Sequence, residues 1–109
     1  MPDTLLALCT CPDDDSAARL ARTLVGEHLA ACVSRVPGLT SVYAWQGQIE
    51  EDTEVLLLIK TTAERFAALR ERLLALHPYA VPELIALDIR DGLPAYLEWL
   101  QQAVAVDHS

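Results

Sequence analysis

Residues 32–61 read CVSRVPGLTSVYAWQGQIEEDTEVLLLIKT, and the architecture follows from their pattern. The first half, residues 32–45, is rich in β-branched and aromatic residues, and its Pro37-Gly38 interruption is typical of a bent or bulged strand. Gln46-Gly47-Gln48 supplies a tight turn, after which residues 49–61 return as a second strand. The sequence therefore predicts a long β-hairpin whose tip projects from the rest of the domain.

Short apolar runs and amphipathic patterns flank this hairpin on both sides. Residues 4–11 form an apolar strand that ends before Pro12, and residues 17–29 follow with one apolar helical face. After the hairpin, an amphipathic helix over 63–77 precedes a strand over 83–89, and Pro94 begins a short final helix. This order, βαββαβ plus a C-terminal helix, predicts an α+β fold. We expect a ferredoxin-like split βαβ sandwich with both main helices on one face of the sheet.

The second strand of the hairpin predicts a sheet that is apolar on both faces. Val55, Leu57 and Ile59 point one way, while Leu56 and Leu58 point the other. Two helices of this length cover only one face, and a soluble monomer rarely exposes an apolar patch larger than about a few hundred Å². The bare face is therefore predicted to be an interface between copies of the chain.

Length, composition and charge restrict the class of protein. The 109 residues are 52% hydrophobic and 22% charged, which predicts one folded domain over residues 1–109. Eight basic and sixteen acidic residues give a net charge of −8, which argues against nucleic-acid binding and favours cations as partners. No apolar run reaches the ~20 residues that span a bilayer, so no membrane partner is expected.

The N-terminus and the cysteines indicate the compartment. The first basic residue is Arg19, so the chain lacks the basic region of a signal peptide. The three cysteines, Cys9, Cys11 and Cys32, cannot all pair within one chain. We therefore expect a cytoplasmic protein with free thiols.

Several motifs occur in order and together cover nearly the whole chain. They are residues 9–12 (CTCP), 29–33 (LAACV), 37–47 (PGLTSVYAWQG), 59–61 (IKT), 77–83 (HPYAVPE) and 96–100 (YLEWL). In these motifs the sequence resembles the CutA divalent-cation tolerance family. The resemblance implies a ferredoxin-like protomer in a tight homotrimer, similar to the PII-type signalling trimers. It also implies a link to tolerance of copper and other divalent metals, with no enzymatic reaction generally assigned.

Cys9 and Cys11 are the first candidate metal ligands. They lie two residues apart on a strand, so both thiols share a face, and thiolates suit soft ions such as Cu(I). The alternative is that both are small buried side chains at a strand end. The resemblance implies that copper-binding members use the cysteine matching Cys9 with two consecutive histidines before Pro-Tyr. Here Leu76 replaces the first histidine, which leaves His77.

A site built on Cys9 and His77 would need a further ligand from Cys11, a water molecule or a neighbouring subunit. The alternative role for His77 is an interaction with the last carbonyls of its helix. His28 is expected to be a partly exposed residue at a helix end, and no role is expected for His108.

Lys60, the only lysine, supports a second hypothesis. It alternates onto the predicted bare face, where a charge needs a partner such as Glu83. The functional alternative is a cleft between subunits, comparable to the small-anion sites of PII-like trimers. Its candidate residues are Tyr43, Trp45, Lys60, Tyr79, Glu83 and Trp99.

Two acidic clusters allow a structural or a cation-binding interpretation. Residues 13–15 precede a helix and are typical of carboxylates that cap its free N–H groups. Glu50, Glu51, Asp52 and Glu54 follow the hairpin turn and favour a solvated edge over a weak hard-cation surface. We favour the structural interpretation for both clusters.

The sequence predicts a non-enzymatic homotrimer that binds copper or another transition-metal ion, without an organic cofactor. The alternative is a PII-like signalling or adaptor trimer that binds a small metabolite or a protein partner in clefts between subunits. An acylphosphatase-type reaction is discounted because the chain contains no asparagine. The sequence also lacks a Gly-x-Ser-x-Gly elbow and a Gly-rich phosphate loop.

Overall fold

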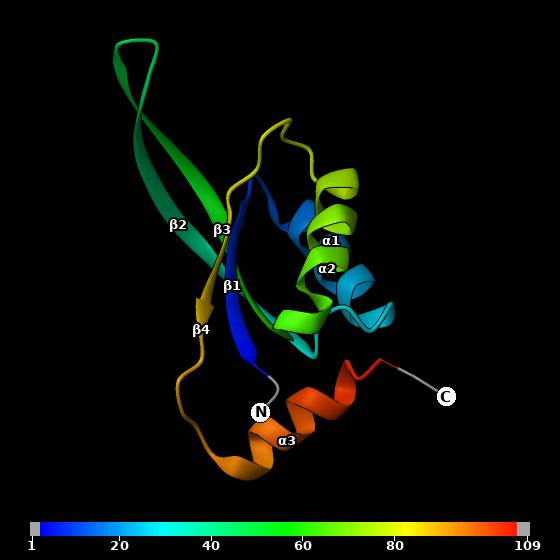
Figure 1. Cartoon of the computed structure of the whole chain (residues 1–109). Coiled ribbons are helices and arrows are strands. Elements are labelled where there is room, and N and C mark those ends of the chain that lie inside the picture. The colour runs from blue at the N-terminus through cyan, green and yellow to red at the C-terminus, as the bar shows by residue number, and fades with distance from the viewer. Residues whose placement is uncertain (1–2, 107–109) are drawn as a thin grey trace.

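The computed structural model describes residues 3–106, so His108 lies outside the described part of the chain (Figure 1). The elements follow in the predicted order. They are β1 (Thr4–Cys11), α1 (Asp14–Gly26), β2 (Cys32–Trp45), β3 (Gln48–Thr62), α2 (Ala63–Leu76), β4 (Leu84–Asp88) and α3 (Pro94–Ala103). The predicted α+β class and the βαββαβ order with a C-terminal helix are confirmed.

The four strands form one antiparallel sheet in the order β2-β3-β1-β4. The two central strands are β1 and β3, with Leu8 of β1 opposite Leu58 of β3. Helices α1 and α2 lie together on one face of this sheet (Figure 1). This is the arrangement expected of a split βαβ sandwich.

The core lies between the two helices and the sheet. Strand alternation turns Ala7, Cys9 and Cys11 of β1 and Leu57 and Ile59 of β3 toward the helices, and all five are fully buried. Their helical partners are Ala17, Leu20, Leu24, Leu69 and Leu73. The two cysteines of β1 therefore belong to the main core, on the side of the sheet that the helices cover.

The helix α1 ends earlier than the apolar pattern predicts. It ends at Gly26, and His28 follows in the left-handed region with φ 59°. The N–H groups of Leu29 and Ala30 both donate to the carbonyl of Leu24, at 2.9 and 3.1 Å, which closes the helix end. Leu29 consequently packs into the core from the turn and not from the helix. His28 is exposed, as expected for a helix-end residue.

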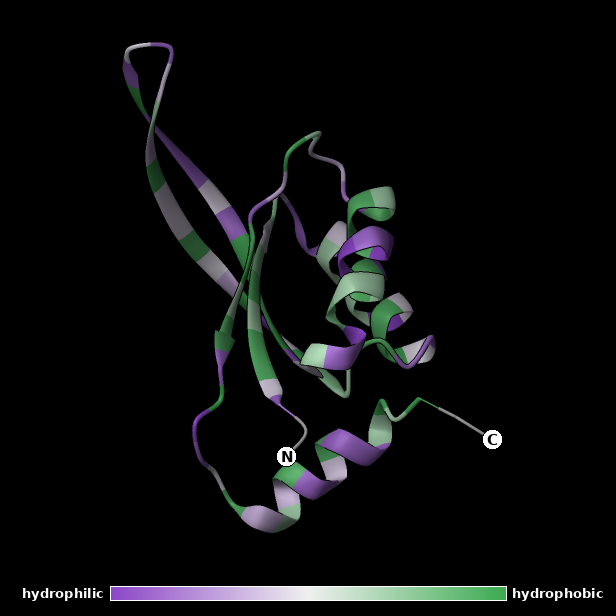
Figure 2. Ribbon diagram, in the orientation of Figure 1, coloured by the Kyte–Doolittle hydropathy of each residue, from purple (hydrophilic) through white to green (hydrophobic). Residues whose placement is uncertain are grey.

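The hairpin formed by β2 and β3 extends far beyond the sandwich (Figure 1). We call residues 39–54 the arm. The pairing register shifts between Val36 and Leu39, with Gly38 at φ 78°, which confirms the predicted bulge. At the tip, Gln46 and Gly47 both have positive φ, as a two-residue hairpin turn of the primed type requires. Green and purple segments alternate along the arm in Figure 2, so apolar and polar residues are mixed along both of its strands.

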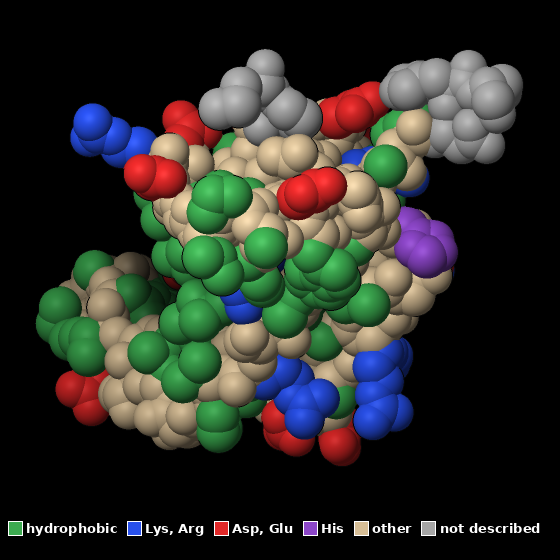
Figure 3. All heavy atoms as spheres, turned by 90° about the horizontal axis from the view of Figure 1, so that it is seen from below, with side chains coloured by type: hydrophobic (Ala, Val, Ile, Leu, Met, Phe, Trp, Pro, Cys, Tyr) green, Lys and Arg blue, Asp and Glu red, His purple; other side chains and the backbone are tan. Residues whose placement is uncertain are grey.

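The second face of the sheet has no helix over it and is apolar, as predicted. Leu6, Leu8, Leu56 and Leu58 are only half-buried on it. The side chains of Ile85 and Leu87 on β4 are 51% and 50% exposed. In the view from below, hydrophobic side chains gather over the centre and left of the molecule (Figure 3). An apolar surface of this kind is unusual on a soluble monomer.

The helix α3 closes one end of the sandwich. Leu100 and Val104 are buried against Ala31, and Nε of Arg65 donates to the carbonyl of Val104 at 2.9 Å. Among residues 3–106, every helix is too short or too polar to cross a membrane.

Candidate functional site

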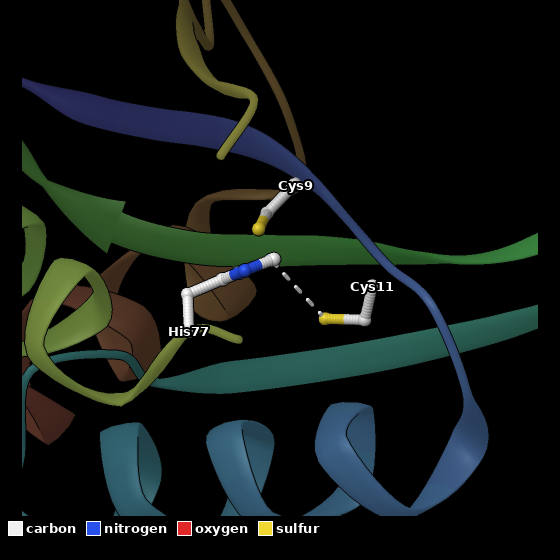
Figure 4. Close-up of side chains that lie close together, drawn as sticks. All are labelled: Cys9, Cys11 and His77. Carbon is white, nitrogen blue, oxygen red and sulfur yellow. Dashed lines mark hydrogen bonds between the residues drawn. The ribbon is translucent and has the colours of Figure 1, made fainter. Parts of the chain in front are cut away.

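Cys9, Cys11 and His77 converge inside the core at the end of the sheet where α2 stops. Both cysteines come from the helix-facing side of β1, and His77 is the first residue after α2. Pro78 follows His77, which favours the extended backbone that His77 adopts at φ −71° and ψ 137°. The imidazole therefore extends from the helix end toward β1 (Figure 4).

The three potential ligand atoms lie within 4.8 Å of one another, and all three residues are buried. Cys11 Sγ and His77 Nε2 are 3.8 Å apart. Within residues 3–106 this is the one group of three or more His, Cys, Asp or Glu side chains whose ligand atoms converge in this way. The structure thus brings together the predicted pair, Cys9 and His77, and the predicted third ligand, Cys11.

Both ring nitrogens of His77 make hydrogen bonds with the backbone. Nε2 donates to the carbonyl of Thr10 at 2.8 Å, and Nδ1 accepts from the N–H of Tyr79 at 3.0 Å. Because Thr10 offers an acceptor and Tyr79 a donor, the ring is the neutral tautomer with its proton on Nε2. The predicted alternative, a ring bonded to the last carbonyls of α2, is wrong, since the ring bonds to β1. Only the backbone N–H of His77 meets the helix, at the carbonyl of Leu73.

The two thiols affect each other's ionisation in opposite directions. The pKa of Cys9 is raised far above its usual range, first by its hydrogen bond with Cys11, then by burial and nearby negative charge. The same hydrogen bond lowers the pKa of Cys11, although burial opposes this. Cys11 is therefore the first thiol to ionise. A second thiolate requires a cation in the site.

The donor set determines which ion this site suits. Two thiols and one imidazole are soft or borderline ligands, which favour Cu(I) or Zn²⁺ over Mg²⁺ and Ca²⁺. No carboxylate joins the three atoms within residues 3–106. The arrangement can hold a soft ion away from solvent, because both thiols are fully buried.

A second group of predicted residues lines an open cleft at the base of the arm. Tyr43, Trp45, Tyr79 and Glu83 share a cavity of about 480 Å³ with four further residues, which are Thr10, Asp52, Glu54 and Val81. The cleft begins at Thr10, whose carbonyl accepts the His77 bond, so it adjoins the cysteine cluster across β1.

Lys60 and Trp99, predicted for the same cleft, are not among its lining residues. Nζ of Lys60 donates to Ser34 Oγ at 2.8 Å and contacts Cys32 Sγ at 3.8 Å. Trp99 packs on Tyr96 of α3 with ring centroids 5.5 Å apart.

The predicted ion pair between Lys60 and Glu83 is also wrong. Lys60 lies opposite Leu6 of β1, whereas the strand that follows Glu83 begins opposite Cys9, three residues further along. Among the described residues, ion pairs join Arg35 to Asp14 and Arg72 to Glu27 only. The two predicted partners therefore belong to different ends of the sheet.

Sequence reasoning missed the roles of Asp52 and Glu54. The hydroxyl of Tyr43 donates to Asp52, and the hydroxyl of Tyr79 donates to Glu54 Oε2 at 2.8 Å. The predicted solvated edge fits the exposed Glu50 and Glu51 but is wrong for Glu54, which is 8% exposed. The available signal was strand alternation, which places Asp52 and Glu54 on one face of β3.

The acidic cluster before α1 has the predicted structural role at Asp13. Its Oδ1 accepts from the N–H of Ser16 at 2.8 Å, which caps the helix. This hydrogen bond holds the pKa of Asp13 below its usual value. Asp14 pairs with Arg35 at 3.4 Å on the surface.

Comparison with known proteins shows the family of this chain. The sequence profile described as "CutA1 divalent ion tolerance protein" matches residues 5–103. The chain belongs to the CutA1 family. A CutA divalent-cation tolerance protein from Thermus thermophilus is 54% identical over 97 residues, which are 89% of this chain and 94% of that protein.

Solved structures of CutA1 proteins share the fold as well. A structure of the Thermus thermophilus protein superposes with a TM-score of 0.91 at 51% identity, covering 94% of this chain and 99% of that one. CutA from Archaeoglobus fulgidus, described as periplasmic, has a TM-score of 0.87 at 36% identity and covers 95% and 99%. This chain spans 65% of the length of a Xenopus laevis CutA homologue and 54% of mouse CutA.

Proposed function

We propose that this CutA1 protein binds one soft transition-metal ion, Cu(I) above all, at Cys9, Cys11 and His77, and catalyses no reaction. The observation that carries the proposal is the convergence of three buried ligand atoms within 4.8 Å. The family description, divalent ion tolerance, supports a relation to metal ions. The choice of copper rests on the two thiols, because thiolates are the preferred ligands of Cu(I).

Metal binding at this site requires the loss of protons. Cys9 is protonated when the site is empty of positive charge, because its hydrogen bond with Cys11 and its burial raise its pKa. His77 Nε2 carries the proton that it donates to Thr10, so it binds metal only after releasing that bond. Affinity for Cu(I) is therefore expected to rise with pH across the neutral range.

The direct test is competition for Cu(I) against a chromophoric chelator under anaerobic, reducing conditions. We expect one ion per chain, with affinity reduced by about a hundredfold in Cys9→Ser and in Cys11→Ser, since each loses a thiolate. Cys32→Ser is the matched control. It removes the same chemical group from the contact with Lys60, on β2 and outside the cluster.

Two outcomes would contradict the site. One is a Cys9→Ser variant that binds copper as tightly as the unmodified chain. The other is an equal loss of affinity in Cys32→Ser, which would indicate nonspecific thiol binding.

We propose that the protein works as a homotrimer in the cytoplasm. The apolar sheet face and the exposed apolar side chains on the face of the arm away from the cleft need cover, and Val42 and Ile49 there are 61% and 74% exposed. Three copies follow from the resemblance to the family. A reducing compartment suits the three free cysteines.

The alternative function is a PII-like signalling or adaptor trimer that binds a small metabolite or a protein partner in clefts between subunits, and it stays a prediction. The cleft within one chain does not favour a small anion as the ligand. Lys60 lies outside the cleft, and none of the eight residues that line the cleft is basic. Three of them are carboxylic acids, so the local charge would repel a phosphate or a carboxylate.

A further inference from the structure

We infer that the cleft at the base of the arm binds an organic cation, meaning an amidinium, guanidinium or alkylammonium group attached to a flat or apolar body. The cleft holds about 480 Å³ and is lined by three carboxylates, three aromatic rings, Thr10 and Val81. The three ligands of the proposed metal centre are not among the residues that line this cleft.

The carboxylates supply the negative charge of the cleft and form no ion pair with any of residues 3–106. Asp52, Glu54 and Glu83 line it, and neither ion pair of the described residues includes any of them. Glu54 is the most informative because it is nine-tenths buried, with 8% exposure. A buried carboxylate without a cation is costly, so the cleft favours the entry of positive charge.

One oxygen of Glu54 is aimed into the cleft. Oε2 accepts the Tyr79 hydroxyl at 2.8 Å, and no hydrogen bond from residues 3–106 reaches Oε1. Every fully buried polar side-chain atom in this part of the chain has a hydrogen-bond partner. Oε1 must therefore meet open space, and the cavity that Glu54 lines provides it.

The tyrosines hold two of the carboxylates in place. Tyr43 donates to Asp52 and Tyr79 donates to Glu54. The hydrogen bond to Asp52 is the main cause that raises the pKa of Tyr43, whereas burial and then the hydrogen bond to Glu54 raise the pKa of Tyr79. The phenols consequently stay protonated at neutral pH and donate to the carboxylates. This leaves the remaining oxygens free to accept from a ligand.

The aromatic rings and the spacing of the carboxylates favour an organic cation over a small metal ion as the ligand of this cleft. Asp52, Glu54 and Glu83 do not bring their oxygens close enough to form a converging ligand group, whereas the cysteine cluster does. Hard ions need about six or more arranged oxygens. Rings such as those of Tyr43 and Trp45 contact the face of an organic cation, where the π-electrons attract positive charge.

The test uses benzamidine, whose amidinium group is attached to a flat ring, with neutral benzamide and anionic benzoate as isosteric controls. Binding is measured by titration calorimetry on the full chain at constant ionic strength. We expect benzamidine to bind at least about tenfold more tightly than benzamide, and benzoate not to bind. Trp45→Ala, Asp52→Asn and Glu83→Gln should each weaken benzamidine binding by about fivefold, and all three positions are exposed.

The matched control is Glu51→Gln, which removes the same charge from the opposite face of the same strand. It pairs with Val42, whereas Asp52 and Glu54 share a face with Tyr43 and Glu50. If Glu51→Gln weakened benzamidine binding as much as Asp52→Asn does, the inference would be wrong, because the loss of net charge alone would then explain the effect. Absence of benzamidine binding, or stronger displacement by Ca²⁺ than by Na⁺ at equal ionic strength, would also overturn it. Cys9→Ser should leave benzamidine binding intact, which separates this test from that of the metal centre.

Discussion

His77 uses both ring nitrogens for backbone hydrogen bonds, and this ties the proposed metal centre to the stability of the fold. The ring joins β1, through Thr10, to the segment after α2, through Tyr79. His77→Ala should lower the free energy of unfolding by about 2 to 3 kcal/mol, because it leaves buried partners unpaired. His77→Gln, which keeps a donor and an acceptor, should lose less. Urea denaturation measures both.

His28→Ala is the control for that series, because His28 is exposed and makes no ring hydrogen bond among the described residues. Its unfolding midpoint should match that of the unmodified chain. If His77→Ala unfolds at the same urea concentration as His28→Ala, the assigned hydrogen bonds do not hold the ring.

The pKa of Tyr43 provides a second prediction at the scale of single residues. Its hydrogen bond to Asp52, with the surrounding carboxylates, raises its pKa to about 12. The pKa of Tyr43 is higher in the folded chain than in the unfolded chain. The stabilisation of the fold by the hydrogen bond from Tyr43 to Asp52 is therefore fully present below pH ~10, and it is lost as the pH rises through the folded pKa. Asp52→Asn should lower the pKa of Tyr43 toward its ordinary value, followed by phenolate absorbance. Glu51→Gln should shift it less, and a larger shift there would contradict the Asp52 contact.

The convergence of Cys9 and Cys11 with His77 could be predicted, whereas the partners of the lysine and the acids could not. Cys9 and Cys11 share a face by alternation alone, the pairing of Cys9 with His77 followed from the resemblance to the family, and Cys11 was one of three possible further ligands. Lys60 and Glu83 were paired wrongly because the register along β1 decides which ends of strands meet. The burial of Glu54 depends on Tyr79, which follows α2 and is distant in sequence.

At the scale of elements, the capped start of α1 makes a pH-dependent prediction. The hydrogen bond from Ser16 lowers the pKa of Asp13, so the cap stabilises the helix above pH ~4 and is lost as pH falls through the folded pKa. Asp13→Ala should therefore lower the thermal midpoint at pH 7 and lower it less in acid, once Asp13 is protonated in the folded state. Asp15→Ala, in the first turn and without that hydrogen bond, is the control. An equal deficit of Asp13→Ala at pH 7 and in acid would contradict the cap.

The order of elements and most of their limits could be predicted because local signals mark them. Pro12, Pro37-Gly38, Gln46-Gly47 and Pro94 each lie at a boundary or irregularity that the structure contains. The end of α1 was predicted too late, since Leu29 continues the apolar spacing after the helix has closed on Leu24. Periodicity cannot distinguish a core residue on a helix from one in the turn that follows.

At the scale of the whole molecule, the uncovered sheet face predicts self-association. Light scattering after size exclusion should give about 36 kDa, three times the 12.0 kDa of one chain. Leu87→Asp, on the bare face at 50% exposure, should shift the mass toward that of a single chain, because it would bury an unpaired charge. Leu74→Asp, at 54% exposure on α2 and on the helix side of the sheet, should leave the assembly intact. A single-chain mass for the unmodified protein at micromolar concentration would contradict the proposed trimer.

The metal centre is tested most directly by X-ray absorption at the copper edge on the Cu(I)-loaded protein. We predict two sulfur scatterers and one nitrogen scatterer around each copper, with one sulfur lost in Cys9→Ser and both retained in Cys32→Ser. A first shell that contains only oxygen and nitrogen, or a spectrum that Cys9→Ser leaves unchanged, would contradict a copper site at Cys9, Cys11 and His77.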